Sequence, residues 1–193
     1  AEWLGTPTHV WHPEVALVPH IDLLLYEPSE ELGRNYYTLI TDGMSDARMT
    51  FPPEIQDMSG RAELVQYVGE IDVEAAKVKP PWYVTAILYL ARFPFAYRTW
   101  LGVSHTVPNG EPPAPFVPDS LLTAALFMAP VFEPEGLCRG LTVAGDPVDI
   151  LWLAFITSAE LQYKLDAGYT ALLERFRAGH FPQLLDPYRA SLI

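Results

Sequence analysis

One stretch of the sequence provides the strongest prediction of the fold: Tyr36-Tyr37-Thr38-Leu39-Ile40-Thr41-Asp42-Gly43-Met44-Ser45-Asp46. Its first half alternates β-branched and aromatic residues, which predicts a strand packed on at least one face. The strand ends at Asp42-Gly43, because glycine permits a tight turn with positive φ. A second strand is predicted over residues 62–68, Ala-Glu-Leu-Val-Gln-Tyr-Val. The polar segment between the two strands is therefore placed to display side chains on a rigid scaffold.

Further strands are predicted on both sides of this stretch. Residues 20–27 are largely apolar and end before Pro28, and we expect them to pair antiparallel with residues 35–41 across a short polar turn. Residues 141–144 and 148–156 predict a hairpin whose second strand is central in the sheet, since that strand is nearly all apolar. Two less regular segments, 8–11 and 121–128, are also assigned to strands.

Two long helices are predicted. The first begins at Trp82, after two prolines, and is ended or kinked by Pro94. Apolar residues surround its axis, so we expect this helix to be buried between layers. The second begins with a capping box formed by Thr157 and Glu160 and continues to a C-terminal cap at Gly179. The fold class is therefore α+β, a mixed and largely antiparallel sheet with helices packed on it, in a single domain over residues 1–193.

Composition limits the classes of function. Half of the 193 residues are hydrophobic and 19% are charged, which is typical of a folded domain. No apolar run reaches the roughly 20 residues that span a bilayer, so no membrane is expected as a partner. The net charge of −12 disfavours nucleic acid and suits a basic protein partner. Cys138 is the single cysteine, which excludes a disulfide within the chain and favours a cytoplasmic location.

Several separated motifs stand out along nearly the whole chain: His20-Ile21-Asp22, Thr41-Asp42-Gly43-Met44-Ser45-Asp46, Arg61-Ala62-Glu63-Leu64, Leu90-Ala91-Arg92-Phe93-Pro94, Trp100-Leu101-Gly102 and His105-Thr106-Val107-Pro108-Asn109-Gly110. In this order they resemble the suppressor-of-fused domain family. The loop from Ser104 to Gly110 is similar to the bacterial, single-domain type. The resemblance implies an α/β sandwich and a function in binding rather than in catalysis.

Catalytic and metal motifs are weak. Asp42, Ser45 and His105 are residue types of a hydrolase, but the serine lacks a G-x-S-x-G context, and we expect Asp42 and Ser45 to bond their own turn. His20 and Asp22 would share one face of a strand, yet HExxH and cysteine-pair motifs are lacking, so no metal and no cofactor are predicted. Arg61 and Glu63, two residues apart, are expected to form an ion pair that fixes strand register.

Aromatic residues gather at the end of the first predicted helix and in the proline-rich loop 102–119 that follows. Aromatic side chains beside adaptable polar groups are typical of protein interfaces, although they can also simply complete a core. The resemblance points to the same region, since in animal suppressor of fused the corresponding helix and loop help to hold an extended peptide. We therefore expect a partner-binding surface formed by Asp42, Met44, Ser45, Phe93, Tyr97, Trp100, His105 and Asn109.

The predicted function is that of a non-enzymatic, protein-binding module. The resemblance to the bacterial type implies an immunity protein that neutralises a toxin domain, and the acidic charge suits a basic toxin. Two alternatives stay open: a hydrolase-like enzyme that uses Asp42, Ser45 and His105, and a regulatory adaptor that binds an extended peptide. The identity of the partner and the oligomeric state are not predicted.

Overall fold

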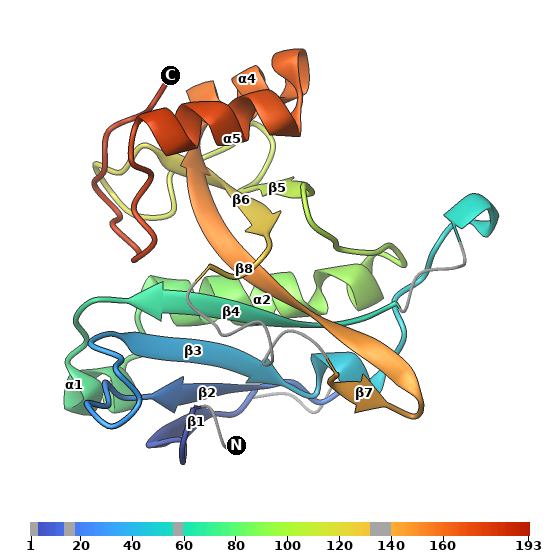
Figure 1. Cartoon of the computed structure of the whole chain (residues 1–193), viewed down its shortest axis with the longest axis vertical. Helices are drawn as coiled ribbons and strands as arrows, with labels where there is room; N and C mark the ends of the chain where they lie inside the picture. The colour runs from blue at the N-terminus through green and yellow to red at the C-terminus, as the bar shows by residue number, and fades with distance from the viewer. Residues whose placement is uncertain (1–3, 14–17, 56–59, 132–139) are drawn as a thin grey trace.

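The computed structural model describes residues 4–13, 18–55, 60–131 and 140–193, and within these ranges it contains an eight-stranded sheet with helices on both faces (Figure 1). The strands are β1 (His9–Trp11), β2 (Asp22–Tyr26), β3 (Tyr37–Asp42), β4 (Arg61–Val68), β5 (Thr106–Pro108), β6 (Leu122–Met128), β7 (Thr142–Val143) and β8 (Asp146–Thr157). The helices are α1 (Val73–Val78), α2 (Trp82–Ala96), α4 (Ser158–Ala167) and α5 (Tyr169–Ala178), with short 3-10 turns η1 (Met44–Asp46) and η2 (Pro53–Ile55).

The sheet follows the order β1-β2-β3-β4-β8-β6-β5, with β7 pairing beside β8. Only the β4–β8 pair is parallel among the described strands, which confirms the predicted mixed and largely antiparallel α+β fold. β2 and β3 are antiparallel neighbours with Leu24 opposite Ile40, as the short turn between them predicts. β8 lies in the middle of the sheet, because twelve residues that are mostly apolar need cover on both faces.

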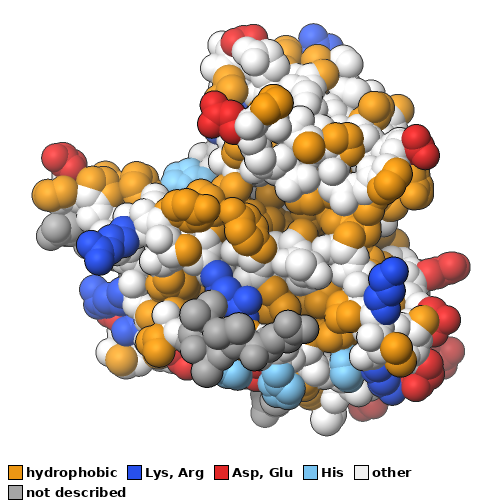
Figure 2. Space-filling model, turned by 180° about the vertical axis from the view of Figure 1, so that it is seen from behind, with side chains coloured by type: hydrophobic (Ala, Val, Ile, Leu, Met, Phe, Trp, Pro, Cys, Tyr) orange, Lys and Arg blue, Asp and Glu red, His pale blue; other side chains and the backbone are white. Residues whose placement is uncertain are grey.

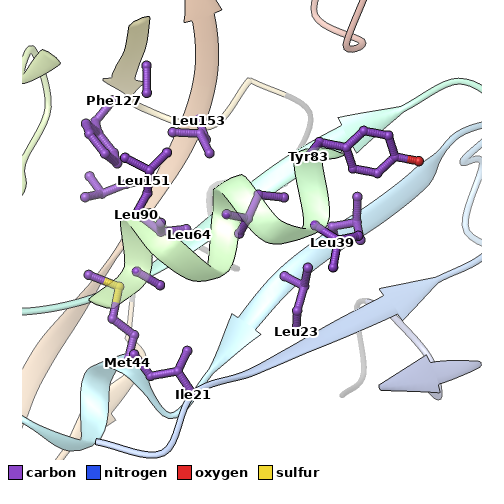
Figure 3. Close-up of a cluster of buried hydrophobic side chains, with 14 of the residues drawn as sticks. Ile21, Leu23, Leu39, Met44, Leu64, Tyr83, Leu90, Phe127, Leu151 and Leu153 are labelled. Carbon is purple, nitrogen blue, oxygen red and sulfur yellow. The ribbon is translucent and has the colours of Figure 1, made fainter. Parts of the chain in front are cut away.

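Alternation along the central strands creates two cores. Leu64 and Leu151 point to the face covered by α2, whereas the next residues along the same strands, Val65 and Trp152, point to the face covered by α5. Figure 3 shows the α2 core, in which side chains from the sheet pack against side chains from one side of the helix. The labelled residues are Ile21, Leu23, Leu39, Met44, Leu64, Tyr83, Leu90, Phe127, Leu151 and Leu153.

The first long helix differs from its prediction. α2 forms an outer layer instead of lying between two layers: Ile87 is fully buried against the sheet, but Tyr89 two residues on is 54% exposed. Apolar residues all round a helix predict cover on all sides, and the described part of the chain supplies that cover on one side only. Part of the apolar surface of α2 is therefore left to solvent.

The last predicted helix is in fact two. The capping box of Thr157 and Glu160 starts α4 as predicted, and Gly179 caps α5 as predicted. Between them Gly168 has φ 91°, a left-handed conformation that ends α4 and lets the chain turn into α5. None of the described helices combines the length and the hydropathy that crossing a bilayer requires.

The proline-rich loop 102–119 carries the short edge strand β5, which ends at Pro108. Proline is tolerated at a sheet edge because an edge residue needs no amide donor toward a further strand. Cys138, which the sequence analysis singled out, lies outside the described residues.

Candidate functional site

The loop between β3 and β4 is held by a buried polar network, here called the loop network. The carboxylate of Glu63 accepts hydrogen bonds from Thr41 Oγ1 at 2.5 Å, from the amide of Ser45 at 2.8 Å and from the amide of Gly43 at 3.2 Å. Arg61 Nη1 donates to the carbonyls of Ser45 at 2.6 Å and Asp46 at 2.9 Å. One acid and one base from β4 thus fix both sides of η1.

The predicted ion pair between Arg61 and Glu63 is wrong. The Arg61 guanidinium pairs with Asp146 at 2.9 Å, while the Glu63 carboxylate faces amides and a hydroxyl. Burial raises the pKa of Glu63, and the hydrogen bonds from Thr41 and Ser45 oppose that rise only in part. Hydrogen bonds from Arg48 and Arg61 lower the pKa of Asp146.

Gly43 is required where it stands. Its φ is 101°, and a Cβ atom at this position would lie 2.2 Å from the backbone oxygen of His20. The turn after β3 therefore packs directly on the residue that leads into β2, and a side chain cannot fit between them.

The loop network explains where three of the predicted partner-binding residues lie. Met44 is 1% exposed and Ser45 is 6% exposed, so both belong to the interior and neither presents a side chain to a partner. Figure 3 shows Met44 directed into the α2 core near Ile21. Asp42 is exposed at the end of β3 and stays available to a partner.

Trp100 and His105 form a second group. The Trp100 ring lies 5.4 Å from the His105 ring and 5.7 Å from the Phe51 ring, centroid to centroid, and all three are half-buried. Burial lowers the pKa of His105, and a hydrogen bond to the Trp100 backbone opposes the shift. Asn109 Nδ2 donates to the carbonyl of Ala114 at 2.9 Å within its own loop.

The residues of the hydrolase alternative have different partners in this structure. The amide and side chain of Ser45 are bound to Glu63, and His105 is bound to the Trp100 backbone. No hydrogen bond joins the Asp42, Ser45 and His105 side chains among the interactions of the described residues. A nucleophile and its base need such a contact, so this arrangement gives a hydrolase no support.

Phe93 and Tyr97 lie elsewhere, in a groove of about 680 Å³ along the open side of α2, here called the α2 groove. Figure 2 views the molecule from the side on which α2 lies and shows hydrophobic side chains gathered around basic ones. The end of β1 contributes Trp11 to one side of the groove, and the Trp11 ring is fixed by a hydrogen bond from its Nε1 to the carbonyl of Ala76 in α1. Its lining is Trp11, His12, Pro13, Pro80, Val84, Thr85, Leu88, Tyr89, Arg92, Phe93, Ala96 and Tyr97.

Arg92 is the feature of the α2 groove that demands an explanation. Its Nε and Nη2 atoms are closed from solvent, and neither has a hydrogen-bond partner among the described residues. A guanidinium that gives up water without gaining an acceptor costs free energy, typically about 1–3 kcal/mol per lost bond. Tyrosine hydroxyls lie on the same surface: Tyr89 Oη is 3.5 Å from Tyr97 Oη, and this hydrogen bond raises the pKa of Tyr89.

Phe93 and Tyr97 were predicted from the sequence as site residues, whereas Arg92, Tyr89 and Leu88 were not. A signal for Arg92 was present, since it is the only charged residue between Trp82 and Tyr97. A lone charge in an apolar helix points either to a buried partner or to a function, and sequence alone does not distinguish these outcomes.

The sequence matches one family model, and the structure is similar to solved structures of the same family. The family model described as Suppressor of fused protein (SUFU) matches residues 18–190. A suppressor-of-fused homologue from Neisseria gonorrhoeae FA 1090 has a similar structure, with a TM-score of 0.68, 17% identity, and coverage of 96% of this chain and 87% of that chain. No curated protein matched the sequence.

Two further structures are similar at the level of fold. The chain from the Sufu–Fu complex has a TM-score of 0.58 and 15% identity, with 90% of this chain and 77% of that chain covered. Drosophila Suppressor of Fused has a TM-score of 0.57 and 16% identity, with 89% of this chain and 42% of that chain covered. The present chain thus spans less than half of the Drosophila protein. Matched over residues 18–190, the chain belongs to the suppressor-of-fused family.

Proposed function

We propose that this chain is a non-enzymatic module that binds an extended segment of a partner protein in the α2 groove. The observation that carries the proposal is Arg92, whose Nε and Nη2 are buried with no acceptor in the described part of the chain, in a groove lined by apolar and aromatic side chains. Both atoms are closed from solvent, so a partner gains this hydrogen-bond energy only when its binding opens the groove and brings an acceptor to them.

The lining of the α2 groove defines the chemistry of the bound segment. Leu88, Phe93 and Tyr97 offer apolar contact, and a guanidinium selects a carboxylate by two parallel hydrogen bonds. The expected ligand is therefore an extended peptide with an aspartate or glutamate between apolar side chains. The Sufu–Fu complex supports a binding function, since it shows a related fold in complex with another protein.

An immunity protein that neutralises a basic toxin domain is the second candidate, and the net charge of −12 favours it. Complementary charge accelerates encounter and makes association sensitive to salt. The two candidates predict different partners: a linear segment in the first case, and a folded basic domain in the second. Asp42, Trp100 and His105 stay proposed contacts for the folded domain, since all three retain exposed surface.

The test is a selection of linear peptides from a random display library against the purified chain. We expect the selected peptides to carry an acidic residue between apolar residues and to shift the NMR signals of Tyr89 and Phe93. The variant Arg92→Leu should bind these peptides at least about tenfold more weakly, since it loses a charge-assisted contact at the centre of the surface.

Arg177→Leu is the matched control, because Arg177 is exposed on α5, and α5 covers the opposite face of the sheet. It should bind the selected peptides as the wild type does. If no peptide is enriched, or if Arg92→Leu retains full affinity, the α2 groove is not a peptide site. Salt-sensitive binding of a basic domain with no peptide competition would then favour the immunity function.

A further inference from the structure

Two histidines and an aspartate converge at the end of the β1–β2 pair. His12 follows β1, His20 precedes β2, and Asp22 is the first residue of β2. His12 Nδ1 lies 3.0 Å from Asp22 Oδ1, and His20 Nε2 lies 2.9 Å from the same oxygen. One ligand atom from each side chain lies within 4.8 Å of the other two. We call this group the His-His-Asp cluster.

The contacts in the cluster are not hydrogen bonds. Asp22 Oδ1 is closed from solvent and has no hydrogen-bond partner within the described chain, although two ring nitrogens lie within 3.0 Å of it. Neither ring therefore directs an N–H group at this oxygen. A buried carboxylate oxygen without a donor is costly, so the arrangement calls for a cation that all three atoms can share.

The geometry agrees with metal coordination. Zinc binds imidazole nitrogen and carboxylate oxygen at about 2.0–2.2 Å, which sets tetrahedral ligand atoms about 3.3 Å apart. The two nitrogen–oxygen separations of 2.9 and 3.0 Å are close to that value. Two histidines with one carboxylate form a recurrent ligand set for Zn²⁺ and for other divalent transition metals, and they leave a further coordination position open.

The surroundings of the cluster favour a cation. Asp42 lies directly opposite Asp22 in the β2–β3 register, and like charges opposite each other across two strands are destabilising. A dication between the rings reduces this repulsion. The His20 backbone is also fixed, because Gly43 packs against its carbonyl. His20 and Asp22 therefore come from a fixed strand end, and both histidine side chains are more than half exposed, which leaves a path for the ion.

We propose that His12, His20 and Asp22 bind one divalent transition-metal ion, with Zn²⁺ as the representative ligand. The site is separate from the loop network, whose buried carboxylate Glu63 is occupied by its own chain. It borders the α2 groove through His12, which belongs to both. Figure 2 shows histidine side chains gathered at the lower edge of the face that carries the groove.

The proposal is tested by titrating Zn²⁺ into the full chain, purified without a histidine tag, with isothermal calorimetry as the readout. We expect one ion per chain with a micromolar or lower dissociation constant, and a higher unfolding temperature in the presence of Zn²⁺. His12→Ala, His20→Ala and Asp22→Asn should each weaken Zn²⁺ binding at least about tenfold. His9→Ala is the matched control, since His9 lies on β1 outside the cluster, and it should bind Zn²⁺ unchanged.

Co²⁺ provides a readout that does not depend on the variants folding. Bound to the wild type, it should give the visible d–d absorption of a nitrogen and oxygen site, without the sulfur charge-transfer band that Cys138 would produce. A sulfur band would assign the ion to Cys138 and overturn the proposal. Absence of Zn²⁺ and Co²⁺ binding at micromolar concentration would overturn it as well, and so would unchanged Zn²⁺ affinity in His20→Ala.

Discussion

The loop network and the α2 groove both contain an arginine and closely packed side chains, but they differ in whether their polar groups have hydrogen-bond partners. In the loop network Arg61 and Glu63 form hydrogen bonds to groups of their own chain. In the α2 groove the Nε and Nη2 atoms of Arg92 are buried and find no acceptor among the residues that the structure describes. The motifs Thr41–Asp46 and Arg61–Leu64, which carry the family resemblance, thus serve to hold the fold. We expect recognition of a partner where polar groups of the described residues lack hydrogen-bond partners, as in the α2 groove.

The largest effect is expected from Gly43→Ala. The added methyl group meets the His20 carbonyl at 2.2 Å and forces a non-glycine residue to a φ of 101°, which should cost about 4 kcal/mol of unfolding free energy. Chemical denaturation measures this loss. Gly102→Ala is the control, because a Cβ atom there has no neighbour within 4 Å, and it should change stability by less than about 0.5 kcal/mol. Equal effects of the two substitutions would contradict the role of Gly43.

The second largest effect on stability is expected from Arg61→Leu, and it should distinguish Arg61 from Arg92. Arg61→Leu removes the donors to the Ser45 and Asp46 carbonyls and should destabilise the fold by about 3 kcal/mol. Arg92→Leu removes two buried donors, Nε and Nη2, that have no acceptor within the described ranges, so it should leave stability unchanged or raise it by up to about 1 kcal/mol. Urea unfolding of both variants compares them directly. A loss of stability in Arg92→Leu as large as that in Arg61→Leu would remove the distinction between the two regions.

Glu63→Gln should have a smaller effect, which depends on pH. At neutral pH it should lower the unfolding free energy by about 2 kcal/mol, because a side-chain NH2 group replaces a carboxylate oxygen that accepts from the backbone N–H groups of Ser45 and Gly43. The pKa of Glu63 is raised above its usual 4.5, so the folded state binds this proton more tightly than the unfolded state. Its contribution to stability is full below pH 4.5 and is lost as the pH rises through the folded pKa. The stability difference between the wild type and Glu63→Gln should therefore be larger at pH 4 than at pH 8. A difference independent of pH would show that the carboxyl does not titrate with folding.

The smallest effect is expected at the exposed end of the loop network. Arg48 donates to Asp146 at 2.8 Å, but its side chain is 58% exposed, so water and salt screen the pair. Arg48→Ala should leave the unfolding midpoint nearly unchanged and raise the pKa of Asp146 toward its ordinary value of 3.8. NMR titration of the Asp146 carboxyl measures the shift. A pKa that stays as low as in the wild type would assign the whole effect to Arg61.

Sequence reasoning succeeded for the elements that local chemistry determines. The strands around Leu24 and Ile40, the capping box at Thr157 and the central position of β8 follow from alternation, capping and apolar length. It failed where distant segments decide the outcome. The cover on α2 depends on which elements pack against it, and the break at Gly168 depends on a φ angle that a helical pattern does not reveal.

The candidate sites divide in the same way. Phe93 and Tyr97 were predicted from their chemistry and lie in the α2 groove, whereas Met44 and Ser45 were predicted from an exposed loop and lie in the interior. A polar loop between strands indicates display on a scaffold, and here the scaffold itself reaches into the loop with Arg61 and Glu63. The predicted pairing of these two residues was wrong, because spacing gives a shared face but not the partner on that face.

The sequence by itself determined the family, the class of the fold and most of the strands, because these depend on residue types at short spacing. Only the tertiary structure decided that Asp146 is the partner of Arg61, that Nε and Nη2 of Arg92 have no acceptor among the described residues, and that His12 meets His20 and Asp22. These facts rest on residues separated along the chain, whose side chains meet only after the sheet has paired. Hydrogen bonds and metal coordination require atoms to lie within a few ångströms of one another, so the packing of the folded chain determines which of them form.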